Sequence, residues 1–166
     1  GMDAAALKAS IAGELFGDLA VPMKIGRYEV EAPLGEGGMS VVYAARDPVL
    51  ERRVALKLLS SAAPTDERRR ARMVREAQAL ARLSHPNVVQ VYEVGVHDDD
   101  MFVAMELVEG QTLRDWLEPG RPWQQVVGVF VRAAEGLSAA HRLGLVHRDF
   151  KPDNVMVELG ADDRVM

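Results

Sequence analysis

Residues 147–154 read His147-Arg148-Asp149-Phe150-Lys151-Pro152-Asp153-Asn154, and this stretch decides the interpretation of the chain. A loop with so many polar side chains, placed directly after an apolar helical segment, commonly carries chemistry. Asp149 can accept a proton, Lys151 can hold a charged group during its transfer, and Asn154 can offer an oxygen ligand to a hard cation such as Mg²⁺. The stretch therefore predicts a catalytic loop rather than an ordinary polar turn.

A glycine-rich segment lies far upstream of this loop and reads Gly35-Glu36-Gly37-Gly38-Met39-Ser40-Val41-Val42. Backbone N–H groups of such a segment can approach a phosphate closely, although an ordinary glycine-rich hairpin is an alternative. The chain continues as a strand rather than a helix, which excludes a dinucleotide-binding fingerprint. It also contains no Gly-Lys-Ser/Thr triplet, which excludes a Walker loop.

Val54-Ala55-Leu56-Lys57 lies on an expected strand. Side chains alternate along a strand, so Lys57 should face away from Val54 and Leu56. A lysine in the middle of a strand either points to solvent at a sheet edge or has a charged partner. Glu76, on the inward border of a neighbouring expected helix, is the candidate partner, with a solvated helix surface as the alternative.

The alternation of apolar runs and turn residues predicts the secondary structure. Five strands are expected, in a largely antiparallel sheet, at 28–34, 41–47, 53–59, 88–97 and 101–107. One helix, which follows Pro64-Thr65 and stops at Ser84-His85-Pro86, should flank this sheet. Two more helices are expected at 113–117 and 123–143. Strands followed by helices indicate the α+β class. The long helix carries an apolar surface wider than one stripe, which predicts packing on two sides and comprises Val126, Val127, Phe130, Ala133, Ala134, Leu137 and Ala140.

Composition narrows the classes of partner. The 166 residues include 20 Lys and Arg against 25 Asp and Glu, and the formal charge of −5 argues against a nucleic-acid partner. The chain has no cysteine, so a cytoplasmic location is the default expectation.

No apolar run approaches the ~20 residues of a membrane span. Gly1 before Met2 looks like a tag remnant, and 1–25 is expected to be an N-terminal extension with an amphipathic helix bearing Leu7, Ile11, Leu15 and Leu19.

Taken in order, these motifs resemble the signature set of protein kinases. The set comprises the glycine-rich hairpin, Val-Ala-Leu-Lys, the helix glutamate, a strand ending in Met105-Glu106-Leu107-Val108-Glu109-Gly110, and the 147–154 loop. The pair Lys151-Pro152 is similar to what Ser/Thr kinases show at these positions. The residue sequence of the hairpin resembles that of the bacterial eukaryotic-like (Hanks-type) branch. The resemblance runs from about Gly26 to the end and implies a protein-kinase-like α+β fold, with an N-lobe at 26–107 and, at 108–166, a hinge and an incomplete helical C-lobe.

The resemblance also implies ATP and Mg²⁺ as cofactors and a protein Ser/Thr hydroxyl as the acceptor. It implies that Lys57 holds the α- and β-phosphates and is oriented by Glu76, that Asp149 accepts the hydroxyl proton, that Lys151 steadies the γ-phosphate, and that Asn154 binds Mg²⁺. The remaining implied nucleotide contacts are Gly35, Gly37 and Ser40 over the phosphates, Leu34, Val42, Ala55 and Met156 around the adenine, the gatekeeper Met105, and the hinge backbone of Glu106 and Val108.

Two departures from the family pattern qualify this expectation. Ser40 stands where the family has a third glycine, and no Asp-Phe-Gly motif follows Asn154 in the sequence. We therefore expect a kinase domain truncated before that motif, with an uncovered apolar stripe available for self-association at Val127, Phe130, Ala134 and Leu137. A non-catalytic pseudokinase or nucleotide-binding scaffold is the alternative. A small-molecule phosphotransferase is disfavoured by Arg148 and by Lys151-Pro152.

We predict that the purified 166-residue chain transfers phosphoryl groups negligibly. The reason is that the carboxylate of Asp-Phe-Gly, which holds Mg²⁺ in kinases, is absent, as are the helices that orient a protein substrate. Transfer of labelled γ-phosphate from ATP to a generic basic protein measures this. Robust transfer that disappears in Lys57→Met would contradict the prediction.

Overall fold

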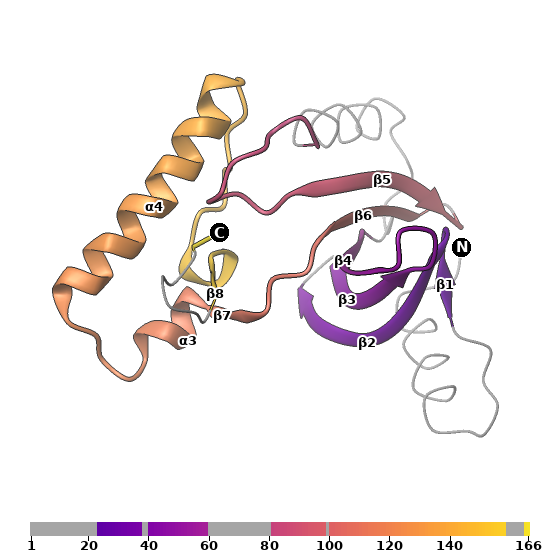
Figure 1. Ribbon diagram of the computed structural model, residues 1–166, viewed down its shortest axis with the longest axis horizontal. Coiled ribbons are helices and arrows are strands. Elements are labelled where there is room, and N and C mark those ends of the chain that lie inside the picture. Colours follow the sequence, from indigo (N-terminus) through magenta and orange to yellow (C-terminus); the bar gives the residue numbers. More distant parts are fainter. Residues whose placement is uncertain (1–22, 38–39, 60–80, 99, 159–164) are drawn as a thin grey trace. The chain divides into compact units, whose positions relative to one another are not determined.

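The protein is described by a computed structural model that covers residues 23–37, 40–59, 81–98, 100–158 and 165–166 (Figure 1). The predicted N-terminal helix and most of the predicted helix after Pro64-Thr65 lie outside the described residues. Of the second helix, Ala81 is helical, and the helix ends there rather than at Ser84. The chain divides into two compact units, residues 1–73 with 92–107 and residues 74–91 with 108–166.

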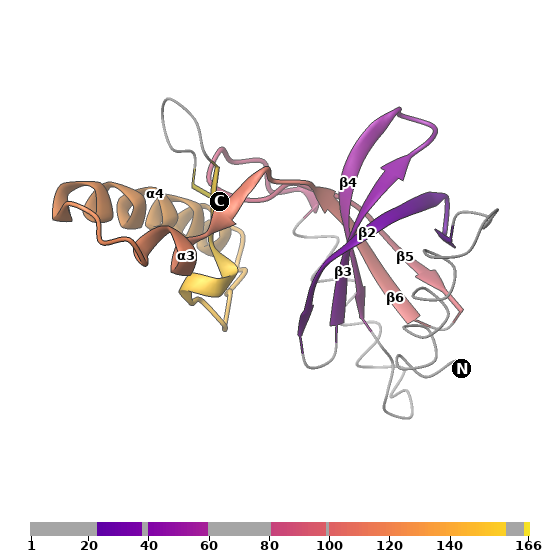
Figure 2. The same ribbon diagram turned by 90° about the horizontal axis from the view of Figure 1, so that it is seen from below.

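The first unit contains a six-stranded sheet in the order β1-β2-β3-β4-β6-β5. The strands are β1 (Lys24–Ile25), β2 (Tyr28–Gly37), β3 (Ser40–Asp47), β4 (Arg52–Leu59), β5 (Val91–His97) and β6 (Asp100–Glu106). Neighbours from β1 to β4, and β4 with β6, pair antiparallel. Figure 2 shows these strands fanned by the usual sheet twist. All five predicted strands are present. The sixth, β1, has two residues, too few to show alternation in the sequence.

β5 begins at Val91, three residues later than the sequence predicts. The preceding residues are held in a turn, because the Val88 N–H donates to the His85 carbonyl at 3.0 Å. The Asn87 side-chain amide donates to the Val165 carbonyl at 2.8 Å, within the second unit. Val88 and Val89 are apolar and β-branched, which predicts a strand, but the local turn and the contact of Asn87 with Val165 override that preference.

The core of the first unit lies on one face of the sheet. Val54, Leu56 and Leu58 of β4 point into it, which confirms the predicted alternation and leaves Ala55 and Lys57 on the opposite face. The buried residues of this core are Ile25, Tyr28, Tyr43, Ala45, Val54, Leu56, Leu58, Phe102 and Ala104. Tyr28 and Phe102 meet edge to face, with ring centroids 5.9 Å apart.

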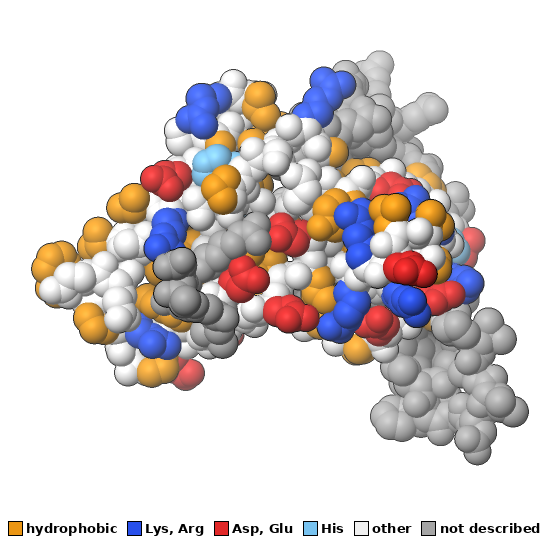
Figure 3. Space-filling model, in the orientation of Figure 1, with side chains coloured by type: hydrophobic (Ala, Val, Ile, Leu, Met, Phe, Trp, Pro, Cys, Tyr) orange, Lys and Arg blue, Asp and Glu red, His pale blue; other side chains and the backbone are white. Residues whose placement is uncertain are grey.

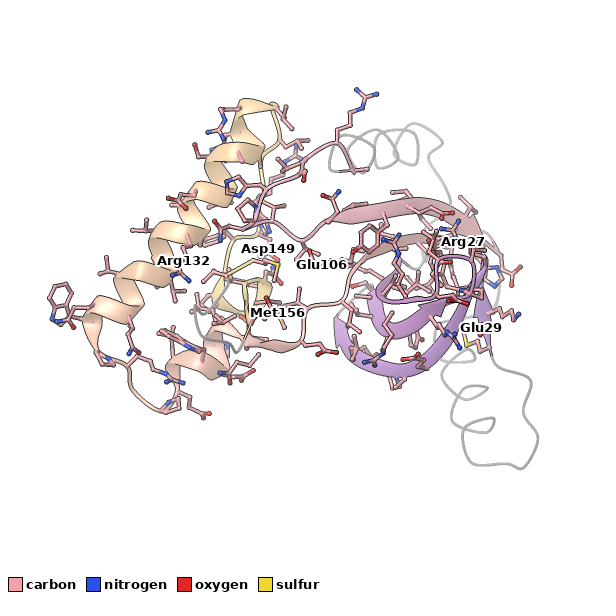
Figure 4. The ribbon with its side chains drawn as sticks, in the orientation of Figure 1. Arg27, Glu29, Glu106, Arg132, Asp149 and Met156 are labelled. Atoms are coloured by element: carbon pink, nitrogen blue, oxygen red, sulfur yellow. The ribbon has the colours of Figure 1, made fainter. Side chains whose placement is uncertain are left out.

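A buried carboxylate at the end of β3 takes part in a network of charged side chains. Asp47, at the end of β3, is fully buried and accepts hydrogen bonds from Arg27 at 3.3 and 3.1 Å and from the N–H groups of Val49 and Leu50 (Figure 4). Arg27 also pairs with Glu93 of β5 at 2.6 Å. Burial alone would raise the pKa of Asp47, but the bond from Arg27 and the two backbone bonds hold that pKa below its ordinary value. The charged network therefore joins the β1–β2 turn to two strands.

The second unit comprises β7 (Gly110–Thr112), α3 (Leu113–Leu117), α4 (Trp123–Arg142), the 3₁₀ turn η1 (Pro152–Asn154) and β8 (Met156–Glu158). β7 and β8 pair antiparallel. The predicted helix at 113–117 is confirmed, and α4 ends one residue before the predicted end of the long helix. Gly144, with φ of 74°, terminates α4 by donating to His141 while Leu145 donates to Ala140. The elements of both units confirm the α+β class.

The buried face of α4 differs in part from the predicted apolar surface. Its buried residues are Val129, Ala133, Gly136 and Ala139, and of these the sequence analysis had named Ala133 alone. Val127 and Phe130 are 51% and 41% exposed, and hydrophobic side chains lie on the surface along α4 in Figure 3. The helix is apolar over more of its circumference than the unit buries, so periodicity alone did not select the packed face. The core of this unit comprises Leu113, Trp116, Val129, Ala133, Val155, Val157 and Val165.

We predict opposite effects for two glycine substitutions in α4. At Gly136 a Cβ would collide with the backbone oxygen of Asn87, so Gly136→Ala should lower the free energy of unfolding by about 1–3 kcal/mol. At Gly128 a Cβ meets nothing, so Gly128→Ala should raise it by up to about 1 kcal/mol through helix propensity. Urea denaturation measures both, and equal effects would contradict the packing of α4 on this turn.

Candidate active site

The register of the strands brings four residues into one row on the face of the sheet opposite the core, and three of them are predicted site residues. Gly35 pairs with Val42, Val42 with Lys57, and Lys57 with Val103. Residues paired directly across neighbouring strands point to the same side. Gly35, Val42 and Lys57, three of the predicted site residues, therefore share one face although they come from three strands.

A second row on this face is lined by small side chains. Ala32 pairs with Ala44, Ala44 with Ala55, and Ala55 with Met105. The row places the predicted residues Ala55 and Met105 side by side. Ala32 and Ala44 belong to it as well, and sequence reasoning missed them because only the register shows which alanines share a face. Ala44 and Ala55 are 2% and 7% exposed, and the row lies two residues along β4 from Lys57.

The β2–β3 hairpin closes with Gly37 paired to Ser40, and its tip, residues 38–39, lies outside the described residues. A Cβ built on Gly35 would meet no atom within 4 Å, so no neighbour explains the glycine and the space over this position is open. Leu34 lies at a register shift between Pro33 and Gly35 and is 53% exposed. The predicted loop residues Gly35, Gly37 and Ser40 thus lie at the end of β2 and the start of β3, near Val42.

The other predicted nucleotide contacts lie at the end of β6 and in the second unit. Glu106 ends β6 and pairs with Val54, and Val108 follows as a half-buried residue of the second unit. Met156 lies on β8, where its N–H and carbonyl pair with those of Met166 at 2.6 and 2.8 Å. Glu76 lies outside the described residues, so its pair with Lys57 stays a prediction.

The predicted catalytic loop brings two of its side chains onto that of Asp149, which is labelled in Figure 4. The ammonium of Lys151 lies 2.9 Å from Oδ2 of Asp149. The Asn154 amide nitrogen donates to the same oxygen at 3.0 Å and to the Asp149 backbone carbonyl at 2.8 Å. The loop bends at Arg148, whose φ is 63°, and the Asp149 N–H donates to the His147 carbonyl at 2.8 Å. Asp149, Lys151 and Asn154 thus form one cluster, as the sequence predicts for a catalytic loop.

The two carboxylate oxygens of Asp149 differ in their contacts with neighbouring side chains. The hydrogen bond from Lys151, and then that from Asn154, hold the pKa of this carboxyl below its ordinary value, so it is anionic at neutral pH. Both side-chain bonds fall on Oδ2. Among the described residues no hydrogen bond reaches Oδ1, which leaves this oxygen available to accept a proton.

The orientation of Asn154 suits a metal ligand. Its nitrogen faces Asp149, so its carbonyl oxygen points elsewhere and is of the kind that Mg²⁺ prefers. Within the part of the chain that the structure describes, no group of three or more His, Cys, Asp or Glu side chains could hold a metal ion. Among the described residues, the Asn154 amide oxygen is thus one candidate ligand of the kind that Mg²⁺ prefers.

Sequence reasoning missed two residues that hold this loop to α3. Arg114 binds Asp153 with both ends of its guanidinium, at 2.6 and 2.8 Å. The hydrogen bond from Arg114 lowers the pKa of Asp153 to about 2. The Leu113 N–H also donates to the Val155 carbonyl at 2.7 Å. The two ion-pair partners are 39 positions apart, and no local pattern could have signalled their contact.

Comparison with known proteins identifies the class. Residues 28–165 match the protein kinase domain family. The chain is 44% identical over 133 residues to a probable serine/threonine-protein kinase of Clostridium perfringens, covering 79% of this chain and 19% of that protein. It is 45% identical over 139 residues to the serine/threonine-protein kinase pkn3 of Myxococcus xanthus, covering 80% of this chain and 25% of that protein. The kinase-domain crystal structure of Mycobacterium tuberculosis PknI aligns with a TM-score of 0.76 at 33% identity, covering 89% of this chain and 60% of that one.

The chain belongs to the protein kinase family, and its relatives are bacterial Ser/Thr kinases. The protein-kinase-like fold is thereby confirmed. The chain spans about a fifth to a quarter of the length of the two curated relatives named above. Within the described residues, no helix combines the length and apolar character needed to cross a membrane.

We predict that Lys151→Met raises the pKa of Asp149 toward its ordinary value, because the carboxylate loses its nearest ammonium. Carbon-13 NMR titration of the Asp149 carboxyl measures this. Lys24→Met removes a comparable exposed pair, Lys24 with Glu29 at 3.1 Å in the first unit, and should leave Asp149 unchanged. An unaltered Asp149 titration in Lys151→Met would show that the two groups do not interact.

Proposed function

We propose that this chain carries the ATP-binding face and the catalytic loop of a Ser/Thr protein kinase, which transfers the γ-phosphoryl group of ATP to a protein Ser/Thr hydroxyl. The observation that supports this best is the cluster in which Lys151 and Asn154 bind Oδ2 of Asp149, while no described residue bonds to its Oδ1. In this proposal residues 26–107 are the N-lobe, and 108–166 are the hinge and the start of the C-lobe.

The first unit would bind the nucleotide. The Lys57 ammonium would hold the α- and β-phosphates and be oriented by Glu76, with the hairpin of Gly35, Gly37 and Ser40 over the phosphates. The small apolar side chains of Ala32, Ala44 and Ala55 on the same face suit the flat adenine ring. Of the residues of this unit, Leu34, Val42, Ala55 and Met105 would surround the ring, and the backbone of Glu106 would bond to it.

The second unit would carry the transfer step. Oδ1 of Asp149 accepts the proton of the substrate hydroxyl as the hydroxyl oxygen bonds to the γ-phosphorus and the bond to the β-phosphate oxygen breaks. Lys151 offsets negative charge on the transferred group, and the carbonyl oxygen of Asn154 would hold Mg²⁺. When bound, Mg²⁺ neutralises charge on the phosphates. The bonds from Lys151 and Asn154 keep Asp149 ionised, which is the state that a proton acceptor needs.

Two substitutions test the binding and the transfer roles separately. Lys57→Met should weaken ATP binding to the 166-residue chain by roughly tenfold to a hundredfold, the worth of a charge-assisted hydrogen bond. Asp149→Asn should leave that affinity within about twofold, but in any longer protein that carries this chain it should reduce transfer by roughly 10²–10⁴-fold. Calorimetry with ATP and Mg²⁺ and a labelled-phosphate assay measure the two.

Lys24→Met is the matched control, because it removes an exposed lysine from the same sheet and should change neither quantity. ATP binding that is unaffected by Lys57→Met would refute the proposed nucleotide site. Binding that responds to Lys57→Met without transfer in any protein that carries the chain would instead favour the non-catalytic scaffold.

A further inference from the structure

The 3₁₀ turn η1 is fastened to α3 on both sides of Asn154. On one side the Arg114 guanidinium grips Asp153, with Nε 2.6 Å from Oδ1 and the second nitrogen 2.8 Å from Oδ2. On the other side the Leu113 N–H donates to the Val155 carbonyl at 2.7 Å. Asn154 lies between these two anchored residues, so its position is set by consecutive residues of α3.

α3 is a firm base for these anchors. Leu113 and Trp116, on either side of Arg114 in the helix, are each 1% exposed and lie in the core of the second unit. Thr112 caps the helix by accepting from the Asp115 N–H at 3.2 Å, and its hydroxyl donates to the Asp115 carboxylate at 2.6 Å. The backbone of Arg114 is therefore held in place by its buried neighbours. Its planar guanidinium makes two hydrogen bonds to Asp153 and so fixes the position of that carboxylate.

We propose that Arg114 is a positioning residue, which fixes η1 through Asp153 and thereby holds the Asn154 amide on Asp149. The catalytic consequence of this role rests on the proposed function, but the geometric role does not. Removing the fork would leave Asp153 unanchored, while the Leu113–Val155 hydrogen bond remains. Asn154 would then swing about that remaining anchor and lose its paired contacts with Asp149.

A simple surface ion pair is the alternative, because Arg114 and Asp153 are 63% and 42% exposed. Such a pair would add a little stability and have no effect on Asn154. The positioning role and the simple ion pair therefore predict different hydrogen bonding of the Asn154 side-chain amide. This difference can be measured without any assay of catalysis.

Nitrogen-15 NMR of the 166-residue chain tests the proposal through the Asn154 side-chain amide. In Arg114→Met and in Asp153→Asn its protons should exchange with water roughly tenfold faster, the factor that corresponds to one ordinary hydrogen bond. The double variant should show no further loss, since both changes break one contact. Arg114→Lys should be intermediate, because an ammonium keeps the charge but cannot bridge both carboxylate oxygens.

Arg53→Met is the matched control. It breaks the exposed pair of Arg53 with Glu31, 3.0 Å apart on the sheet, and should leave Asn154 unchanged. The thermal unfolding midpoint, followed in parallel, should change little in every variant. Asn154 exchange that stays at the wild-type rate in both Arg114→Met and Asp153→Asn overturns the proposal, and so does an equal response in Arg53→Met. A failure of Lys57→Met to weaken ATP binding would refute the proposed function and leave this result standing.

Discussion

Alternation of side chains along β4 is the constraint on which the rest of the first unit depends. Val54, Leu56 and Leu58 must face the core to be buried, and the pleat then directs Ala55 and Lys57 to the other face. Neighbouring strands, held in register, add Gly35, Val42 and Met105 to that face. One strand thus supplies both the hydrophobic core and the cation that the proposed function needs, and a shift of one residue would exchange the two faces.

The second unit holds exposed polar side chains in one arrangement. Asp149, Lys151 and Asn154 lie on a surface loop, where their mutual hydrogen bonds alone would be weak in water. Two features give the loop its shape. The left-handed bend at Arg148 turns Asp149 back, and the anchors from α3 fix the residues that flank Asn154. Buried Leu113 and Trp116 thereby support the anchors that hold this loop.

Local chemistry made some elements predictable and left others hidden. The helix at 113–117, the end of α4 near Gly144 and the alternation of β4 follow from periodicity and from glycine, and all three agree with the structure. The start of β5 does not, because Asn87 and Val88 are held in a turn by bonds to Val165 and His85. On α4, Val127 and Val129 are equally apolar, and only packing decides that Val129 is buried.

The sequence by itself determined which chemical groups this protein carries and in what order, because the motifs of the glycine-rich hairpin, Lys57 and the 147–154 loop each depend on residue type and short spacing. It therefore predicted the family and the cluster of Asp149, Lys151 and Asn154. Tertiary structure alone decided which oxygen of Asp149 is left free, which alanines share a face with Lys57, and that Arg114 grips Asp153. Those outcomes depend on strand register and on contacts between residues far apart in the chain, and no local pattern encodes them.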